Sequence, residues 1–389
     1  MAGPAESSPV ARARALAALI RDAADEAERE RRLPERVAVA MAEAGLYRVA
    51  VPEEFGGLAC DPRTQIETIE AVSEADGAAG WNLMIGIENM GFLGPALPRE
   101  IAEKVFGDPL LVVAGALNPL GRATPVDGGF RVTGQWPFAS GCHNAHWFWG
   151  QCLVQDGDAP VLAPGGGPVL REALIPRSEF EIVDTWRVAG LRGSGSHDVA
   201  VREVFVPEER ITAAMAAPLQ LEHPLYRMPP LNRLAYNKVG VATGIARAAL
   251  DEFAALAANT ARRGSSRALR DKPAVQRAVA EAEIGLRSAR AFVFEAVGTV
   301  WEAAVAGRET SPRERALVHL ACSHAVRAAG DATALVHEAA GTRANFEGHP
   351  LERRLRDVRV VPQHITVSSQ WLETSGGVLL GLASELPFG

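Results

Sequence analysis

The sequence has few of the residues that build covalently or metal-stabilised folds. It contains four cysteines in 389 residues, and none of them forms a CxxC pair. That spacing is typical of zinc sites and redox motifs. Its absence argues against a structural zinc site and against a disulfide framework. The four cysteines are Cys60, Cys142, Cys152 and Cys322.

Positive charge and long apolar runs are also lacking. The formal net charge is −7, so the chain offers no general electrostatic attraction to nucleic acid or to anionic membranes. We find no apolar run of ~18 residues that could span a bilayer. The N-terminus has a charged helical pattern instead of the apolar segment of a signal peptide. We therefore expect a cytoplasmic protein.

Dinucleotide and metal signatures are missing as well. The segment 193–196 (GSGS) departs from GxGxxG and precedes no helix, so it predicts no dinucleotide fingerprint, although its backbone could bind an anion. His319 and His324 are five residues apart, a poor match to one helical face. His337 precedes Glu338 but lacks the second histidine of HExxH. We expect no metal.

Three regions of different character follow one another, and together they predict an α+β protein. Residues 1–108 show helical periodicity, interrupted by an extended piece at 46–52. Residues 109–228 contain short strand candidates, and residues 229–389 contain long alanine-rich helices that suit a four-helix bundle. The predicted long helices are 231–263, 273–306 and 312–340, with a fourth run from Ile365.

The middle region predicts a small β-sandwich or barrel. Glycine, proline and aspartate separate its short apolar segments, which is the spacing of such folds. No helix long enough for a crossover interrupts them, so a Rossmann sheet is disfavoured. The strand candidates are 110–117, 130–133, 148–154, 169–175, 181–184 and 199–206.

The stretch 134–147 (GQWPFASGCHNAHW) combines aromatic residues with one serine, Ser140. An apolar, aromatic-rich run with few hydrogen-bonding groups suits a buried site for a flat heteroaromatic ligand. On composition alone, a hairpin whose aromatic rings fill a β-core explains the stretch equally well.

The order of the three regions, with four local strings, resembles the acyl-CoA dehydrogenase fold over nearly the whole chain. The resemblance implies an N-terminal helical domain, a middle β-domain at the flavin and a C-terminal four-helix bundle. The strings are residues 45–57, 128–134 and 186–196, and the pair Arg356-Asp357.

The carboxylate that dehydrogenation requires is absent from the expected positions. Acyl-CoA dehydrogenases use a carboxylate base to remove the α-proton of the thioester. In that family it is most often a glutamate shortly after the Arg-Asp pair, but here residues 361–367 (VPQHITV) contain none. The family's alternative position falls within residues 231–250, which contain no Asp or Glu, and Glu373 lies too far along the chain.

Ser140 and His364 instead resemble residues of the oxygenase components of two-component flavin monooxygenases, such as p-hydroxyphenylacetate hydroxylase. In that group a serine hydroxyl contacts flavin N5, and a histidine on the last helix faces the reacting flavin edge. The resemblance implies catalytic roles for Ser140 and His364 and cofactor binding by Asn118, Phe138, Ser140 and Trp186. It also implies reduced FMN, or FAD, from a separate flavin reductase, with O2, a small aromatic or polyketide-like substrate and a homotetramer.

The chemistry of these residues fits that interpretation. A serine hydroxyl can donate or accept at N5, and aromatic walls formed by Trp136, Phe138 and Trp147 would keep water from a C4a-hydroperoxyflavin. An imidazole titrates near neutrality, so His364 could act as an acid or as a base.

Each residue also has an ordinary structural explanation. Ser140 could cap a turn, and His364 could face solvent at a helix N-terminus. Phe138 and Trp186 could fill the core, and Asn118 could belong to an Asn-Pro turn.

Three functions therefore stay open. The first is a monooxygenase that uses reduced flavin from a partner, the second a dehydrogenase of acyl thioesters with tightly held FAD. The third is a non-catalytic helical protein that has lost its flavin. Ser140, His364 and the missing carboxylates favour the first.

Overall fold

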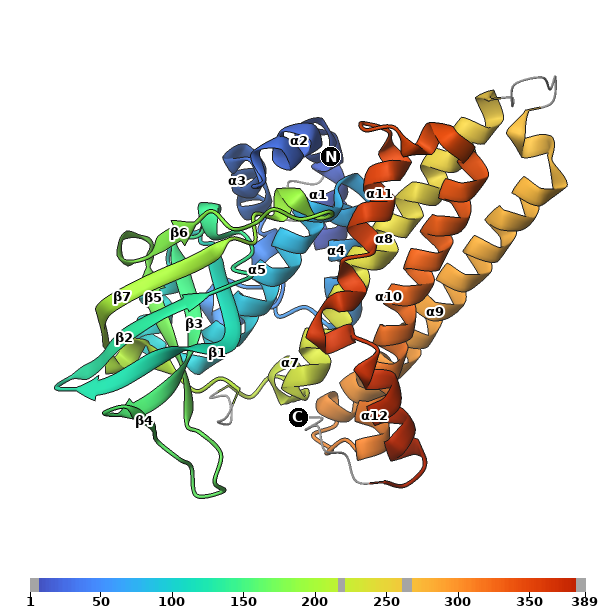
Figure 1. Ribbon diagram of the computed structural model, residues 1–389. Coiled ribbons are helices and arrows are strands. Elements are labelled where there is room, and N and C mark those ends of the chain that lie inside the picture. Colours follow the sequence, from blue (N-terminus) through green and yellow to red (C-terminus); the bar gives the residue numbers. More distant parts are fainter. Residues whose placement is uncertain (1–6, 216–220, 261–267, 383–389) are drawn as a thin grey trace.

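The computed structural model describes residues 7–215, 221–260 and 268–382. Helices occupy the beginning of the chain, strands follow, and long helices close it (Figure 1). The first helices are α1 (Pro9–Ala15), α2 (Ala17–Glu30), α3 (Glu35–Glu43), α4 (Pro62–Ala75), α5 (Gly77–Ala96) and α6 (Arg99–Phe106).

Residues 46–52, which we predicted to be extended, contain a short 3₁₀ turn at Leu46–Arg48. Arg48 lies buried, and its guanidinium donates hydrogen bonds to the carbonyl oxygens of Phe55 and Phe106 at 2.9 and 2.8 Å. The prediction of an extended segment was wrong because these long-range bonds draw the arginine inward.

The middle region forms one connected sheet of eight strands. The order is β6-β7-β2-β1-β3-β5-β8, with β4 attached to β3. The pair β1–β3 is parallel, and the other pairs are antiparallel. The strands are β1 (Val113–Val126), β2 (Gly129–Trp136), β3 (Trp147–Asp156), β4 (Ala159–Pro160), β5 (Leu170–Pro176), β6 (Glu181–Val183), β7 (Asp198–Pro207) and β8 (Ile211–Thr212).

The closing region contains three long helices, as predicted, and α5 lies between it and the sheet (Figure 1). The predicted run from Ile365 begins as a 3₁₀ turn at Ile365–Val367 and becomes α-helical only at Gln370, because His364 and Ser368 adopt extended backbone conformations. The domain boundaries at 108 and 228 stay a prediction. The helices are α7 (Pro224–Arg227), α8 (Pro230–Asn259), α9 (Pro273–Val305), α10 (Pro312–Ala340), α11 (Pro350–Val358) and α12 (Gln370–Leu379).

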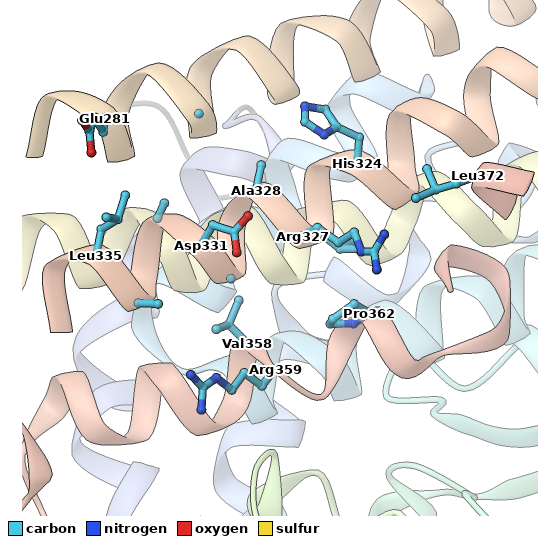
Figure 2. Close-up of a pocket in the computed structure, with 15 residues that line it drawn as sticks. Glu281, His324, Arg327, Ala328, Asp331, Leu335, Val358, Arg359, Pro362 and Leu372 are labelled. Carbon is cyan, nitrogen blue, oxygen red and sulfur yellow. The ribbon is translucent and has the colours of Figure 1, made fainter. Parts of the chain in front are cut away.

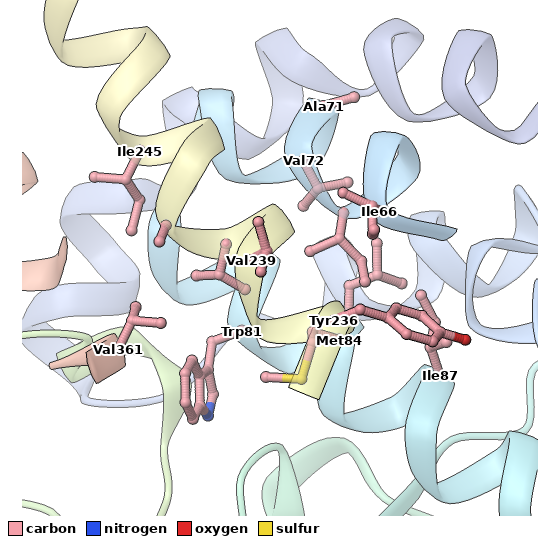
Figure 3. Close-up of a cluster of buried hydrophobic side chains, with 14 of the residues drawn as sticks. Ile66, Ala71, Val72, Trp81, Met84, Ile87, Tyr236, Val239, Ile245 and Val361 are labelled. Atoms are coloured by element: carbon pink, nitrogen blue, oxygen red, sulfur yellow. The ribbon is translucent and has the colours of Figure 1, made fainter. Parts of the chain in front are cut away.

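Two glycines on α8 let this helix approach α4 closely. A Cβ on Gly240 would lie 2.8 Å from the carbonyl oxygen of Ile66, and one on Gly244 would lie 2.6 Å from that of Glu70. The resulting core joins α4, α5 and α8, and Figure 3 shows Trp81 at its margin. None of the described helices is both long and apolar enough to cross a membrane.

His319 makes the stability of this core sensitive to acid. The side chain is buried on α10, and its ring stacks on Trp371 with centroids 3.7 Å apart. Burial lowers the pKa of His319 from 6.5 to about 4, against a smaller opposing effect of a hydrogen bond to the backbone of Thr366. Between these values the unfolded chain binds more protons than the native chain. The free energy of unfolding therefore falls as the pH falls through this window.

We expect His319→Phe, which retains a ring against Trp371, to remove about 3 kcal/mol of this acid sensitivity. Urea unfolding at a series of pH values between 7.5 and 4 measures the change. His324→Phe is the matched control, because His324 lies exposed on the same helix. An unchanged pH dependence in His319→Phe would contradict the assignment.

Candidate active site

Ser140 and His364, distant in the sequence, both contact the indole ring of Trp81. The Trp81 Nε1–H donates a hydrogen bond of 3.0 Å to Ser140 Oγ. The His364 ring meets the same indole edge-on, with centroids 5.7 Å apart and planes at 63°. Trp81 belongs to α5, whereas His364 precedes the last helix. The two residues that we predicted to act together therefore both contact one buried tryptophan.

The hydroxyl group of Ser140 is part of a buried serine cluster. Ser140 Oγ lies 2.7 Å from Ser196 Oγ, which lies 2.8 Å from Ser194 Oγ. The contact of Ser140 Oγ within its own turn, to the carbonyl oxygen of Phe138, is long at 3.5 Å. The principal partners thus come from α5 and from the 193–196 loop. That loop contributes hydroxyl groups here, a role that we did not foresee from its glycines.

The 193–196 loop is fastened to the C-terminal region through Asp357. The backbone N–H of Leu191 donates a 2.6 Å hydrogen bond to Asp357 Oδ1, and Arg356 donates to the carbonyl oxygen of Ala189 at 2.7 Å. Burial, followed by the charge of Asp76, raises the pKa of Asp357 to about 7. The Arg-Asp pair and the β-domain loop, two of the four strings noted in the sequence, therefore bind each other.

Phe138 and Trp186 form an aromatic pair beside Ser140. Their rings are 6.2 Å apart and meet at 86°. Phe138 is 62% exposed, and its φ of 64° lies in the left-handed region that a bulky residue rarely adopts. Trp186 is held by a 3.1 Å hydrogen bond from its Nε1 to the carbonyl oxygen of Leu191. An exposed ring on strained backbone indicates a ligand surface rather than core packing.

Two further sequence expectations have different outcomes. Trp136 packs against Phe148 in the core of the β region and donates to the carbonyl oxygen of Gln151 at 2.7 Å. Our inclusion of Trp136 in a water-excluding wall was therefore wrong, because strand alternation turns its ring inward. Asn118 lies exposed where the register of β1 shifts, and its contact with the cofactor stays a prediction.

The ring of His364 is held by Thr366. The backbone N–H of Thr366 donates to His364 Nδ1 at 3.3 Å, and Thr366 Oγ1 lies 3.0 Å from the same nitrogen. Surrounding protein atoms, and then the charge of Lys238, lower the pKa of His364 well below 6.5. His364 is thus neutral at pH 7, and its partial burial distinguishes it from a solvent-facing histidine.

A buried ion pair that the sequence did not reveal lies near His364. Lys238 Nζ on α8 pairs with Glu88 Oε2 on α5, and the two residues are 1% and 5% exposed. Burial raises the pKa of Glu88 to about 7, although Lys238 opposes the shift. The sequence contains only indirect signs of this pair: Glu88 lies within the apolar segment 77–96, and Lys238 lies within a stretch that lacks acidic residues.

A groove in the described part of the chain lies elsewhere. It has a volume of about 730 Å³ and lies between α9, α10 and the segment after α11 (Figure 2). None of the predicted site residues lines it. Within the described ranges, no group of three or more His, Cys, Asp and Glu side chains could hold a metal.

The residues around Ser140 suit a flavin. The hydroxyl groups of Ser140 and Ser196 provide donors and acceptors for the nitrogen and oxygen atoms at the polar edge of such a ring, and the Trp81 N–H orients Ser140. The exposed ring of Phe138 and the partly buried ring of Trp186, set nearly perpendicular to each other, provide an apolar corner beside them.

Comparison with known proteins identifies the class. Profiles of the acyl-CoA dehydrogenase N-terminal and C-terminal domains match residues 10–97 and 237–369. Indole-3-acetate monooxygenase of Pseudomonas putida is 36% identical over 360 residues, covering 92% of this chain and 89% of that protein. The oxygenase subunit HsaA of Mycobacterium tuberculosis is 31% identical over 365 residues, covering 89% and 88%.

Solved structures agree. The 3-HSA hydroxylase of Rhodococcus sp. RHA1 superimposes with a TM-score of 0.88 at 28% identity, covering 99% of this chain and 100% of that one. The fold and the site define a flavoprotein of the acyl-CoA dehydrogenase class. Within that class, the chain belongs to the flavin-dependent monooxygenases that serve as oxygenase subunits. The predicted fold and class of enzyme are confirmed.

Proposed function

We propose that this chain oxygenates a small aromatic compound at the site formed by Ser140, Trp81 and His364, using reduced flavin from a separate reductase. The observation that carries the proposal is the convergence of Ser140 and His364 on Trp81. The one carboxylate noted near His364, Glu88, is paired with Lys238, so it is not a free base for dehydrogenation.

Bound reduced flavin would supply the activation of O2, and the chain would control hydrogen bonding and water around it. Because Trp81 donates to Ser140 Oγ, one lone pair of that oxygen is occupied, and the hydroxyl hydrogen points to Ser196 or to a ligand atom. Ser194 supports Ser196 in the same way. Ser140 is thus prepared to hold a proton at flavin N5, where Asn118, Phe138 and Trp186 would contribute to binding.

The charge around the ion pair favours an acidic aromatic substrate. Lys238 pairs with Glu88. Arg233, buried on the same helix, stacks on Phe92 and also acts on Glu88 through its charge, so two buried cations accompany one buried carboxylate. An uncompensated buried charge is costly, and a substrate carboxylate would offset it. We therefore propose an aryl-acetate such as indole-3-acetate, the compound named for the relative at 36% identity.

The test supplies reduced FMN or reduced FAD without oxygen and then adds air together with indole-3-acetate or indole. We expect an oxygenated product with at least one of the two flavins. Indole-3-acetate should give at least ~10-fold more product than indole, the scale of one charge-assisted hydrogen bond. Flavin oxidation identical to that in free solution, without product, would refute the function. Bleaching of bound oxidised FAD by an acyl-CoA would favour the dehydrogenase. Failure to bind either flavin would favour the non-catalytic alternative.

We also propose that the protein is a cytoplasmic homotetramer. Gly285, Gly330 and Ala334 line the groove in Figure 2, and small residues permit close approach of a helix from another copy. Light scattering coupled to gel filtration measures the mass, and a monomeric mass would refute the tetramer.

A further inference from the structure

Thr366 presents two hydrogen-bonding groups to one nitrogen of His364. Its backbone N–H lies 3.3 Å from Nδ1, and its hydroxyl oxygen lies 3.0 Å from the same atom. The hydroxyl oxygen also lies 3.3 Å from the backbone carbonyl oxygen of Leu234 on α8. These contacts decide which ring nitrogen carries the proton.

A backbone N–H can only donate, so Nδ1 must offer its lone pair to Thr366. A neutral imidazole carries one N–H, and with Nδ1 accepting, the hydrogen lies on Nε2. The opposite tautomer would direct two hydrogens, one from Nδ1 and one from the Thr366 backbone, at each other. The Thr366 hydroxyl is then free to donate to Nδ1 or to the carbonyl oxygen of Leu234, and either choice leaves this tautomer intact.

We propose that Thr366 fixes His364 as the Nε2–H tautomer, so that His364 provides a hydrogen-bond donor, not a base, to the oxygen atoms handled at the site. This inference rests on the proposed function. Thr366 acts here as a positioning residue, because it works through His364.

Neighbouring groups keep the imidazole neutral and in place. Lys238 carries a positive charge near His364, which disfavours a second proton on the ring. Trp81 meets the ring edge-on and limits its rotation. Among the described residues, Nε2 has no hydrogen-bond partner, so its N–H is available to a ligand.

Substitution of His364 by glutamine or asparagine tests whether this residue acts as a hydrogen-bond donor or as a base. In His364→Gln the side-chain amide reaches about the position of Nε2 and can donate, whereas in His364→Asn it reaches only the position of Nδ1. Neither amide can act as a base. We expect product formation within ~10-fold of wild type for His364→Gln and a loss of ~10²-fold for His364→Asn, the range of one hydrogen bond to a charged group. Equal losses of ~10²-fold or more in both variants would overturn the donor role.

Nitrogen NMR of flavin-free protein labelled at histidine tests the tautomer without any catalysis. The signals that disappear in His364→Gln belong to His364. We expect an unprotonated Nδ1 and a protonated Nε2 at pH 7, and the reverse pattern would overturn the proposal. Because this measurement uses no flavin, it stands even if the proposed function fails in the oxygenation assay.

The role of Thr366 is tested by Thr366→Val and Thr366→Ser. Valine removes the hydroxyl group and leaves the backbone N–H, and serine retains both. Because the backbone N–H still requires Nδ1 to accept, we expect Thr366→Val to keep the Nε2–H tautomer in the NMR spectrum. We expect the loss of the hydroxyl contact to lower product per flavin oxidised ~3–10-fold, with Thr366→Ser restoring the yield. A mixture of tautomers in Thr366→Val would overturn the assignment to the backbone N–H, and a yield identical to wild type would assign the hydroxyl group to packing alone.

Discussion

Replacement of Ser140 by alanine is expected to uncouple flavin oxidation from oxygenation. The variant loses the acceptor of the Trp81 N–H and the partner of Ser196, both of which are buried. It also loses the hydroxyl group that we assign to flavin N5. Loss of one preorganised hydrogen bond at a reacting centre costs ~10²–10³-fold in rate. We therefore expect ~10²-fold less oxygenated product, with hydrogen peroxide released in its place.

The measurement is the yield of product and of hydrogen peroxide for each reduced flavin oxidised in air. Ser194→Ala is the matched control, because it removes a hydroxyl group of the same cluster that bonds Ser196 but not Trp81. It should retain most of the product yield. Full coupling in Ser140→Ala would remove Ser140 from the reaction and leave it a structural role.

Replacement of Lys238 by methionine is expected to destabilise the fold by about 3–5 kcal/mol, the usual cost of removing one partner of a buried ion pair. Met fills the volume of the lysine stem, so packing changes little. The cost arises because Glu88 stays buried without its counter-charge. The double variant Lys238→Met/Glu88→Gln removes the charge from both positions and should recover most of the loss.

The destabilisation caused by Lys238→Met should also depend on pH in a defined direction. Without Lys238, the folded-state pKa of Glu88 rises above its present value of about 7, and it then exceeds the unfolded value by several pH units. When the pKa of a carboxyl group is higher in the native than in the unfolded chain, the free energy of unfolding falls as the pH rises. Lys238→Met should therefore be destabilised more at pH 8 than at pH 6, as measured by urea unfolding. A cost independent of pH, or no recovery in the double variant, would show that packing and not charge holds this position.

Much of the architecture was predictable because it follows from local patterns. The capping residues and periodicity of the helices, and the short alternating strands, are properties of neighbours in the sequence. Ser140 and His364 were identified through strings that resemble a known family, and the structure brings both to Trp81. Their chemical roles stay predictions.

The partners of these residues could not be predicted in the same way. Trp81 is one of many apolar residues on a helix that is buried all round, so periodicity gave it no distinguishing face. Thr366 has no motif of its own, and its importance depends on the orientation of one imidazole. The pair of Glu88 and Lys238 joins two helices that are distant in the sequence, and one chain alone contains no signal of that pairing.

The bond between Leu191 and Asp357 has a consequence during synthesis of the chain. The 193–196 loop emerges from the ribosome long before Asp357, so the bond that fastens it must wait until α11 has been made. All strands of the sheet are therefore made before the 193–196 loop can be fastened, and the site around Ser140 is completed only after the closing helices follow.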